Sequence, residues 1–290
     1  MVKRADIEIR LLCRTDVPHS AAVARAEGWN QTESDWLALL RHSPEGCFAA
    51  TSNGMPVGAV TTIRHGRKLA WIGMMVVQPE FRGRGVGKRL MRAALDHLRQ
   101  AQIETVKLDA TPAGLNLYHS LGFTAQLVIQ RWELVSETLP QVDESSAQQS
   151  ADQLRPAIHA LDRMAFGANR SALLDDLLDR RFIEATVTMP SHTPVALGYG
   201  IARRGAVAFY LGPIVAREES VAVGVLDSLL GRLRGRRVFL DLLAHDDDRA
   251  NFLVARGFAI QRSLSRMSYG KLNSAATSRL IFSSAGPELG

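Results

Sequence analysis

The segment from Trp71 to Leu98 constrains the fold of this chain more than any other part of the sequence. It opens with an apolar run, Ile72–Val77, that is rich in β-branched residues and Met and too short to cross a membrane, so it predicts a buried strand. Pro79 ends the strand, and beyond a glycine-rich stretch apolar residues recur at helical spacing. These residues are Leu90, Met91, Ala94, Leu95 and Leu98. The segment therefore predicts a strand, a glycine loop and a helix.

The glycine loop between strand and helix, Arg82–Lys88, has the composition of an anion-binding site. A helix N-terminus carries unpaired N–H groups and a partial positive charge, and glycines let those groups converge on one anion. Spacing excludes two common phosphate loops, because the P-loop needs glycine where Arg82 stands and the dinucleotide fingerprint needs glycine where Lys88 stands. A tight turn that binds nothing is the alternative, but such a turn needs fewer glycines. The loop therefore predicts a diphosphate site.

The pattern that the loop does match is V-x-P-x-x-R-G-x-G-x-G, which begins at Val77. This pattern resembles the acyl-CoA pyrophosphate loop of the GNAT-type N-acetyltransferases. A second stretch, Lys107–Phe123, is similar to the family's fifth strand, a short helix that carries a tyrosine, and an L-G-F turn. The resemblance implies an α/β (α+β) fold, in which a mixed, mostly antiparallel twisted sheet is flanked by helices.

The resemblance also implies acetyl-CoA as cosubstrate and assigns residues to it. In the family the fourth and fifth strands splay apart, and the pantetheine arm enters the gap as an extra strand. A backbone N–H of the fourth strand would polarise the thioester carbonyl. The expected cofactor-binding residues are Met75, Val76, Val77, Arg82, Gly83, Arg84, Gly85, Val86, Gly87, Lys88, Asn116 and Tyr118.

Tyr118, Asp109 and Asp35 are expected to act in catalysis. Tyr118 matches the family's Y-x-x-L-G-F tyrosine and would protonate the leaving thiolate, although it could instead be a packing residue on its short helix. An attacking amine must first lose a proton, usually to a carboxylate or through water. Asp35, Asp109 and Glu80 are candidates for that base by position, and spacing marks none of them. Asp109 equally suits a role in fixing the strand end.

The stretch from Gly28 to Leu37 supports two interpretations. Thr32 precedes Asp35 by three residues and an apolar run follows, which is typical of a capping box at a helix start, with Trp36 packed inward. In GNAT proteins, however, the junction of the first two helices lines the acceptor pocket. Trp29, Asn30 and Trp36 are therefore substrate-binding candidates.

Composition limits the remaining function classes. The 290 residues suggest about two domains, and two cysteines provide neither a disulfide framework nor a metal site. The N-terminus lacks a signal-peptide pattern and no apolar run reaches 18 residues, so we expect a cytoplasmic protein without membrane contact. The net charge of +6 is spread along the chain, which makes nucleic acid an unlikely partner. No metal is expected, and a homodimer is possible.

The strands expected in the first half are Ile7–Leu11, Cys47–Thr51, Val57–Ile63, Leu69–Val77 and Thr124–Val135. The second half repeats this half faintly. Offsets of 134, 135 and 132 residues separate Pro79 from Pro213, Gly122 from Gly257, and Asp109 from Asp241. The second half lacks the glycine loop and the tyrosine. We therefore expect an acetyl-CoA-binding domain at 1–135, a polar linker at 136–150, and a degenerate GNAT-like domain at 151–290.

The function that follows is transfer of an acetyl group from acetyl-CoA to a primary amine by direct attack. A small molecule or an amino acid is the expected acceptor, because a second domain could roof the cleft. The alternative is an acyl-CoA-binding sensor or interaction protein without transferase activity.

Overall fold

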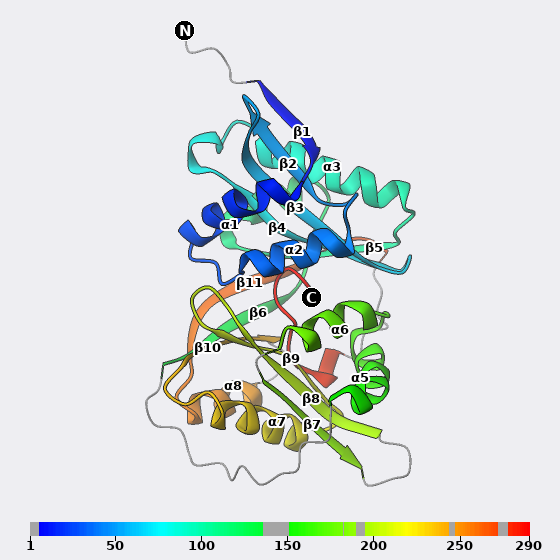
Figure 1. The fold of residues 1–290 in the computed structure, drawn as a ribbon, viewed down its shortest axis with the longest axis vertical. Helices are drawn as coiled ribbons and strands as arrows, with labels where there is room; N and C mark the ends of the chain where they lie inside the picture. The colour runs from blue at the N-terminus through cyan, green and yellow to red at the C-terminus, as the bar shows by residue number, and fades with distance from the viewer. Residues whose placement is uncertain (1–5, 136–150, 182, 190–194, 244–246, 272–277) are drawn as a thin grey trace. The chain divides into compact units, whose positions relative to one another are not determined.

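The computed structural model describes residues 6–135, 151–181, 183–189, 195–243, 247–271 and 278–290. The chain forms two compact units, each of them a twisted sheet with helices against it (Figure 1). The first unit comprises Met1–Thr124, Met267–Leu272 and Leu289, and the second comprises Ala125–Arg266, Asn273–Glu288 and Gly290.

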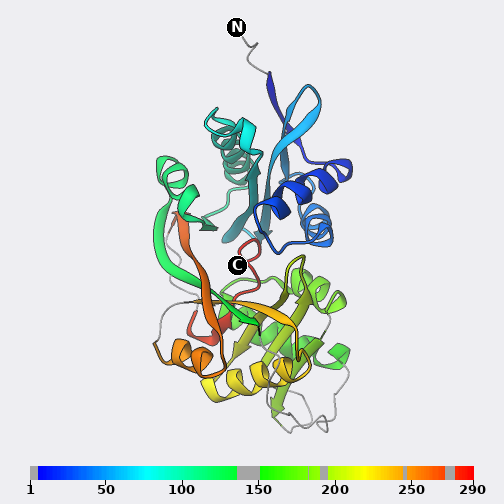
Figure 2. The same ribbon diagram turned by 90° about the vertical axis from the view of Figure 1, so that its left-hand side faces the viewer.

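The first unit contains most of the elements expected from the sequence. They are β1 (Ile7–Leu11), α1 (Val17–Ala26), α2 (Glu33–His42), β2 (Phe48–Ser52), β3 (Met55–His65), β4 (Leu69–Val77), α3 (Val86–Gln100), β5 (Thr105–Ala110) and α4 (Leu115–Ser120). Strands β1 to β4 pair antiparallel in chain order, and β5 lies parallel to β4. Helix α3 covers one face of this sheet and α1 and α2 cover the other (Figure 2). The expected mixed, mostly antiparallel sheet is confirmed.

Helix α3 is held on the sheet by the apolar stripe that its sequence predicts. All five residues of that stripe are buried in the core of the first unit. They pack with Val60 of β3 and with Ala70 and Ile72 of β4. Because the helix is fixed along its length, its N-terminus has a fixed position at the end of β4.

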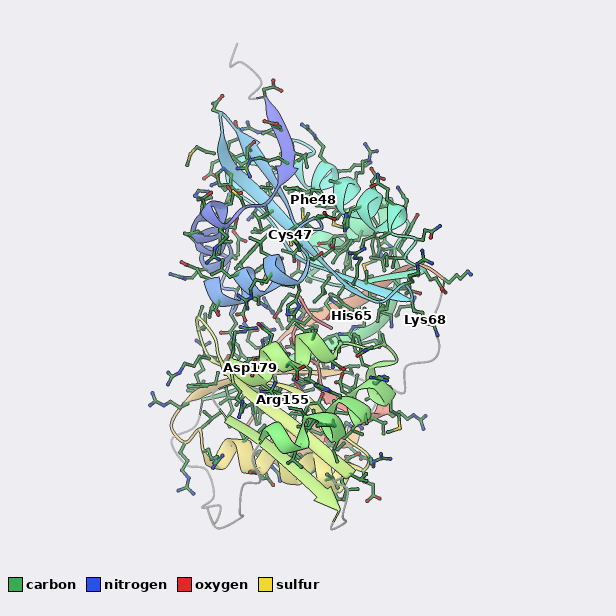
Figure 3. The ribbon with its side chains drawn as sticks, turned by 45° about the vertical axis from the view of Figure 1, so that its right-hand side comes forward. Cys47, Phe48, His65, Lys68, Arg155 and Asp179 are labelled. Carbon is green, nitrogen blue, oxygen red and sulfur yellow. The ribbon has the colours of Figure 1, made fainter. Side chains whose placement is uncertain are left out.

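The second unit repeats this architecture. The elements from β6 onward, of which the end of β11 belongs to the first unit, are β6 (Thr124–Val135), α5 (Ala151–Phe166), α6 (Ser171–Asp179), β7 (Ile183–Met189), β8 (Val195–Arg204), β9 (Phe209–Ala216), α7 (Glu219–Gly231), β10 (Arg237–Leu243), α8 (Asp247–Ala255), β11 (Ala259–Gly270) and β12 (Ile281–Ser283). Side chains alternate across β8: a Cβ at Gly200 would lie 2.6 Å from Val225 of α7, whereas Tyr199 hydrogen-bonds Asp162 of α5. Helices α7 and α5 therefore cover opposite faces. Arg155 of α5 pairs with Asp179 of α6 at 2.6 Å (Figure 3).

The last strand of each half joins the sheet of the other half. Strand β6 follows α4 but pairs antiparallel with β10 over its whole second part, from Ile129 with Leu243 to Val135 with Arg237. Strand β11 follows α8 but is the neighbour of β5 in the sheet order β4-β5-β11-β6-β10. We expected the strand Thr124–Val135 to be the last strand of the first domain. In the structure this strand pairs with β10, which lies in the second half of the chain. The domain division at residue 135 stays a prediction, and the expected linker, 136–150, lies outside the described residues.

The internal repeat is real, but one of its sequence matches is out of register. The turns after α4 and α8 are the same: Gly122 and Gly257 both have positive φ, and the next amide in each bonds five residues back, to Tyr118 and to Leu253. Pro79, in contrast, follows β4, whereas Pro213 lies inside β9. The match between these two prolines is therefore wrong.

Candidate active site

The loop between β4 and α3 has the backbone geometry of an anion site. Gly83 and Gly85 have φ values of 70° and 79°, in the left-handed region that only glycine adopts without strain, and Gly85 is the N-cap of α3. An added Cβ at either position would meet no atom within 4 Å, so the space beside both glycines is open. Arg84 and Lys88 are exposed. The first N–H groups of α3, with two cations next to them, therefore face room for a phosphate group.

Gly87 shows how the helix, the strand and α4 meet. A Cβ at this position would lie 2.9 Å from Met75 Cε of β4 and 3.4 Å from Leu117 Cδ2 of α4. A larger residue here would displace the end of the Met75 side chain, so glycine lets the first turn of α3 pack against both elements without that shift. The third glycine of the loop therefore acts in packing, and it brings α4 with Tyr118 to the loop end of β4.

The Arg82 side chain is bound to the protein itself. Its Nε donates to the carbonyl oxygen of Val77 at 2.9 Å, and its guanidinium pairs with Glu27, the C-cap of α1, at 2.7 Å. Arg82 thus connects the loop to the last residue of β4 and to the C-cap of α1 and so braces it. We expected Arg82 to bind the cofactor, and that role stays a prediction beside the bracing role shown here.

Strands β4 and β5 diverge, as the resemblance implies. Their described pairing covers only Leu69–Trp71 with Thr105–Lys107, so the six residues Ile72–Val77 continue without a partner from β5. Met74 has a φ of 51°, and the register between β3 and β4 shifts beside it, which defines a β-bulge. The bulge bends β4, and an edge of backbone groups faces the widening gap between the two strands.

Tyr118 is buried in the short helix α4. Its ring lies edge-on to Phe123, with 6.1 Å between the ring centroids. Burial raises the pKa of the Tyr118 phenol to about 12, so the phenol stays protonated over the whole physiological range. This protonation state suits a hydrogen-bond donor and excludes a base. Asn116 is on the same helix and is exposed.

The candidates for the base have different surroundings. Asp35 Oδ2 accepts hydrogen bonds from the backbone N and the Oγ1 of Thr32 at 2.8 and 2.9 Å, which is the capping box that the sequence predicts. Asp109 is half-buried on β5, beyond the last residue that pairs with β4. Glu80 is exposed on the turn after β4. By position, Asp109 lies on the strand that borders the gap.

The residues expected to contact the acceptor are divided between core and surface. Trp36 is fully buried in the first unit, as the inward-packing interpretation predicts. Asn30 is buried in the α1–α2 junction and Trp29 is half-buried there. Of the three, Trp29 exposes the most side chain to a possible substrate.

The sequence analysis missed one contact at the end of β4. His19 Nε2 of α1 lies 2.5 Å from Gln78 Nε2, and Gln78 directly follows Val77. With the Glu27–Arg82 pair, this contact ties α1 to the loop at two places. Neither His19 nor Glu27 belongs to a sequence motif. Only the fold brings them to Gln78 and Arg82, so no sequence signal marks either contact.

The second unit lacks these features where it repeats the first. Helix α7 begins after Glu218 instead of a glycine, and Leu253 occupies the turn position of Tyr118. Across the described ranges, the structure contains no group of three His, Cys, Asp or Glu side chains that could hold a metal ion. Within the same ranges, no helix is both long enough and apolar enough to span a membrane.

A glycine loop at a helix N-terminus, a bulged strand and a diverging parallel pair together define an acyltransferase. The chain belongs to the GNAT acetyltransferase family, in its two-domain form. The model of the acetyltransferase (GNAT) family matches residues 11–123, and that of an acetyltransferase (GNAT) domain matches residues 158–283.

Known proteins align with most of this chain. The chain is 28% identical to the holothin acyltransferase of Pseudoalteromonas sp. over 86% of its own length and 83% of the relative. It is 25% identical to the uncharacterized N-acetyltransferase YitH of Bacillus subtilis, over 80% of each chain. The fold matches a putative acetyltransferase from Pyrococcus horikoshii with a TM-score of 0.80, at 22% identity, over 100% of this chain and 98% of that one.

Proposed function

We propose that this protein transfers an acetyl group from acetyl-CoA to the primary amine of a small molecule or amino acid. The observation that carries the proposal is the pairing of an open glycine loop with an unpartnered strand edge on the same strand, β4. An anionic diphosphate suits the loop, and an extended, amide-containing arm suits the edge. The CoA moiety contains both groups in one molecule.

The residues of the first unit divide the binding between them. The N–H groups of Val86, Gly87 and Lys88 would hold the diphosphate, and the β4 edge from Met75 to Val77 would hold the pantetheine amides. The thioester supplies an activated acetyl group. A β4 N–H at the bulge would donate to its carbonyl oxygen as negative charge develops there.

Tyr118 would assist the departure of the thiolate. The ordinary pKa of a thiol is about 8.5, well below the raised pKa of this phenol, so full proton transfer to sulfur is uphill. A hydrogen bond from the phenol to the developing thiolate costs less and still stabilises the charge. Tyr118 would therefore act as a hydrogen-bond donor that remains protonated through the cycle.

Deprotonation of the amine needs a separate group. Asp109 lies on β5, the strand that borders the gap, whereas Asp35 lies on α2 and Glu80 on the turn after β4. We propose Asp109 ahead of Glu80 and Asp35 for this role, directly or through a water molecule.

The comparisons favour a small acceptor. The holothin acyltransferase, whose name gives holothin as acceptor and not a protein, aligns over most of both chains. The N-alpha-acetyltransferase 30 of Dictyostelium discoideum aligns over only 30% of this chain and half of its own length. The part of the chain outside that shorter match is thus shared with the holothin acyltransferase. Trp29 and Asn30 are proposed to line the acceptor side.

The proposal is tested by calorimetric titration with acetyl-CoA of the wild type, Gly85→Glu and Gly54→Glu. Both glycines have φ near 80° and open space around the missing Cβ, so the two substitutions strain the backbone alike. Only the Gly85 variant places a carboxylate at the loop, and we expect its affinity to fall by at least about tenfold. Equal losses in both variants would contradict a diphosphate site at this loop.

An amine panel scored by CoA release then separates transferase from sensor. We expect release with at least one small amine and a much slower rate with peptides that have a free N-terminus. Tight acetyl-CoA binding without release for any amine would favour the sensor alternative. A preference for peptides would remove the small-molecule acceptor.

A further inference from the structure

The gap between the parallel strands of the second unit is filled by the chain itself. Strands β9 and β10 pair directly only where Phe209 and Tyr210 face Val238 and Phe239. Beyond that point β12 lies between them, with Ser283 paired to Ile214 of β9 and to Leu242 of β10. An extended peptide therefore occupies this gap.

The same gap in the first unit has no such strand. Strand β9 precedes α7 as β4 precedes α3, and β10 precedes α8 as β5 precedes α4. Beyond Trp71 and Lys107 the described residues place no strand between β4 and β5. The two units thus differ in what fills one equivalent place of the fold.

The residues around β12 bind its backbone and side chain specifically. Ser283 Oγ donates to Leu211 O at 2.7 Å, and Ser284 N donates to Asp241 O at 3.0 Å. The Tyr210 hydroxyl donates to Ser284 O at 3.1 Å, and burial raises the pKa of this phenol well above its ordinary value, so the donor keeps its proton. Ser283 and Ser284 are almost completely buried. A contact this extensive is part of the folded core.

Two buried arginines bind the residues that follow β12. Arg203 donates to Ala285 O, and Arg170 donates to an oxygen of Gly290 at 2.8 Å. Both arginines are more than nine-tenths buried, and Arg170 is also paired with Asp162 at 2.9 Å. Charged donors placed this deep require acceptors, and the segment from Ser278 to Gly290 provides them.

Gly212 of β9 is shaped for this approach. A Cβ there would lie 2.0 Å from the backbone oxygen of Ser284, a distance that no side chain can accept. Any residue larger than glycine must therefore displace the segment or move β9. The strand has the one residue that admits a second backbone at this distance.

We infer that the β9–β10 groove is a binding site for an extended peptide and that residues 278–290 of this chain are its occupant. The segment takes the space that an acyl-CoA arm would need, in a unit that has neither the glycine loop nor the tyrosine. The segment of residues 278–290 therefore completes the sheet of the second unit, and the chain binds one molecule of acyl-CoA. The stoichiometry rests on the proposed function, whereas the peptide site does not.

The peptide site is tested by amide hydrogen exchange with mass spectrometry on the full chain. In the wild type we expect residues 281–285 to exchange as slowly as the core strands β9 and β10. Gly212→Ala should abolish that protection, while β1 to β4 keep theirs. Gly224→Ala is the matched control, because a Cβ at Gly224 on α7 meets nothing within 4 Å. Fast exchange of residues 281–285 in the wild type would overturn the inference.

A milder variant covers the case in which Gly212→Ala does not fold. Ser283→Ala removes the donor to Leu211 O and the acceptor of Asp241 N without adding an atom. The loss of these two buried hydrogen bonds should speed exchange of residues 281–285 at least about fivefold. Unchanged exchange in this variant would contradict the specific groove.

Calorimetry with acetyl-CoA gives the second readout. We expect one binding event per chain in the wild type and one with at least about tenfold lower affinity in Gly85→Glu. Two events per chain would overturn the assignment of the second gap to peptide. Complete absence of binding in the wild type, with slow exchange of residues 281–285, would contradict the proposed function and leave the peptide site supported.

Discussion

A single phenol provides the sharpest test of the chemistry. In Tyr118→Phe the ring and its packing against Phe123 remain, and only the hydroxyl is lost. We expect kcat to fall roughly tenfold or more with little change in acetyl-CoA affinity, because the hydrogen bond forms as the thiolate develops. Steady-state kinetics with titration calorimetry would measure both. Unchanged kcat would remove Tyr118 from the mechanism.

A second prediction at this scale concerns acid stability. Asp16 is buried and accepts from Arg10 at 2.6 and 2.9 Å, and these hydrogen bonds lower its pKa to about 2, from 3.8. The folded state thus holds this proton less tightly than the unfolded state. The stabilisation is present above about pH 4 and is lost as the pH falls toward 2, and it amounts to roughly 2 kcal/mol.

Urea unfolding of Asp16→Asn and the wild type at pH 7 and pH 3 measures this difference. We expect the variant to be less stable at pH 7 and the gap to narrow at pH 3. Asp96→Asn is the control. Both side chains of the Asp96–Arg99 ion pair are exposed, so the pair contributes little to the free energy of unfolding. A gap that stays constant with pH would show that the Asp16 carboxylate contributes no titrating interaction.

At the scale of elements, the brace between α1 and the loop makes a separate prediction. If Arg82 positions the loop, Arg82→Gln and Glu27→Gln should each weaken acetyl-CoA binding by up to about fivefold. This size follows because an exposed ion pair contributes about 0–1 kcal/mol of free energy. The double variant should then be no weaker than the worse single variant. Should Arg82 instead bind the diphosphate, Glu27→Gln would leave affinity unchanged or improve it. Titration of the four proteins decides between these outcomes.

Elements with local signals were predictable from the sequence. The strand, loop and helix around Gly85 follow from periodicity and glycine spacing, and the Thr32–Asp35 capping box follows from residues three apart. Contacts such as Arg82 with Glu27 could not be foreseen, because the loop motif specifies an anion site and says nothing of a carboxylate 55 residues earlier. Local patterns determine elements, and partners depend on the fold.

Strand pairing marks the same limit more clearly. Strands β6 and β11 have nearly the same alternation of buried and exposed residues. Such alternation shows which face of a strand is buried, but it does not select the neighbouring strand. The sequence therefore predicted β6 as a strand that closes the first half, but it gave no signal for the pairing with β10.

At the scale of the whole molecule, strand exchange predicts that the halves do not stand alone. A chain of residues 1–135 contains β5 without β11, and β6 without either β11 or β10, so three strand edges lose their neighbours. We expect this fragment to aggregate or to unfold, and to be rescued by co-expression with residues 151–290. Size-exclusion chromatography and circular dichroism measure the outcome. A monomeric, folded 1–135 fragment with full acetyl-CoA affinity would contradict the prediction and support a domain boundary at 135.

The exchanged strands also set the order in which the protein can fold during synthesis. Strand β5 ends at Ala110, but its neighbour β11 begins at Ala259, so the ribosome must make almost the entire chain before the first sheet is complete. Until then, the catalytic half has an open strand edge at β5. Loop closure over such a distance is slow and exposes the nascent chain to aggregation. Production of this enzyme should therefore depend on translation rate and chaperone supply more than production of a single-domain GNAT does.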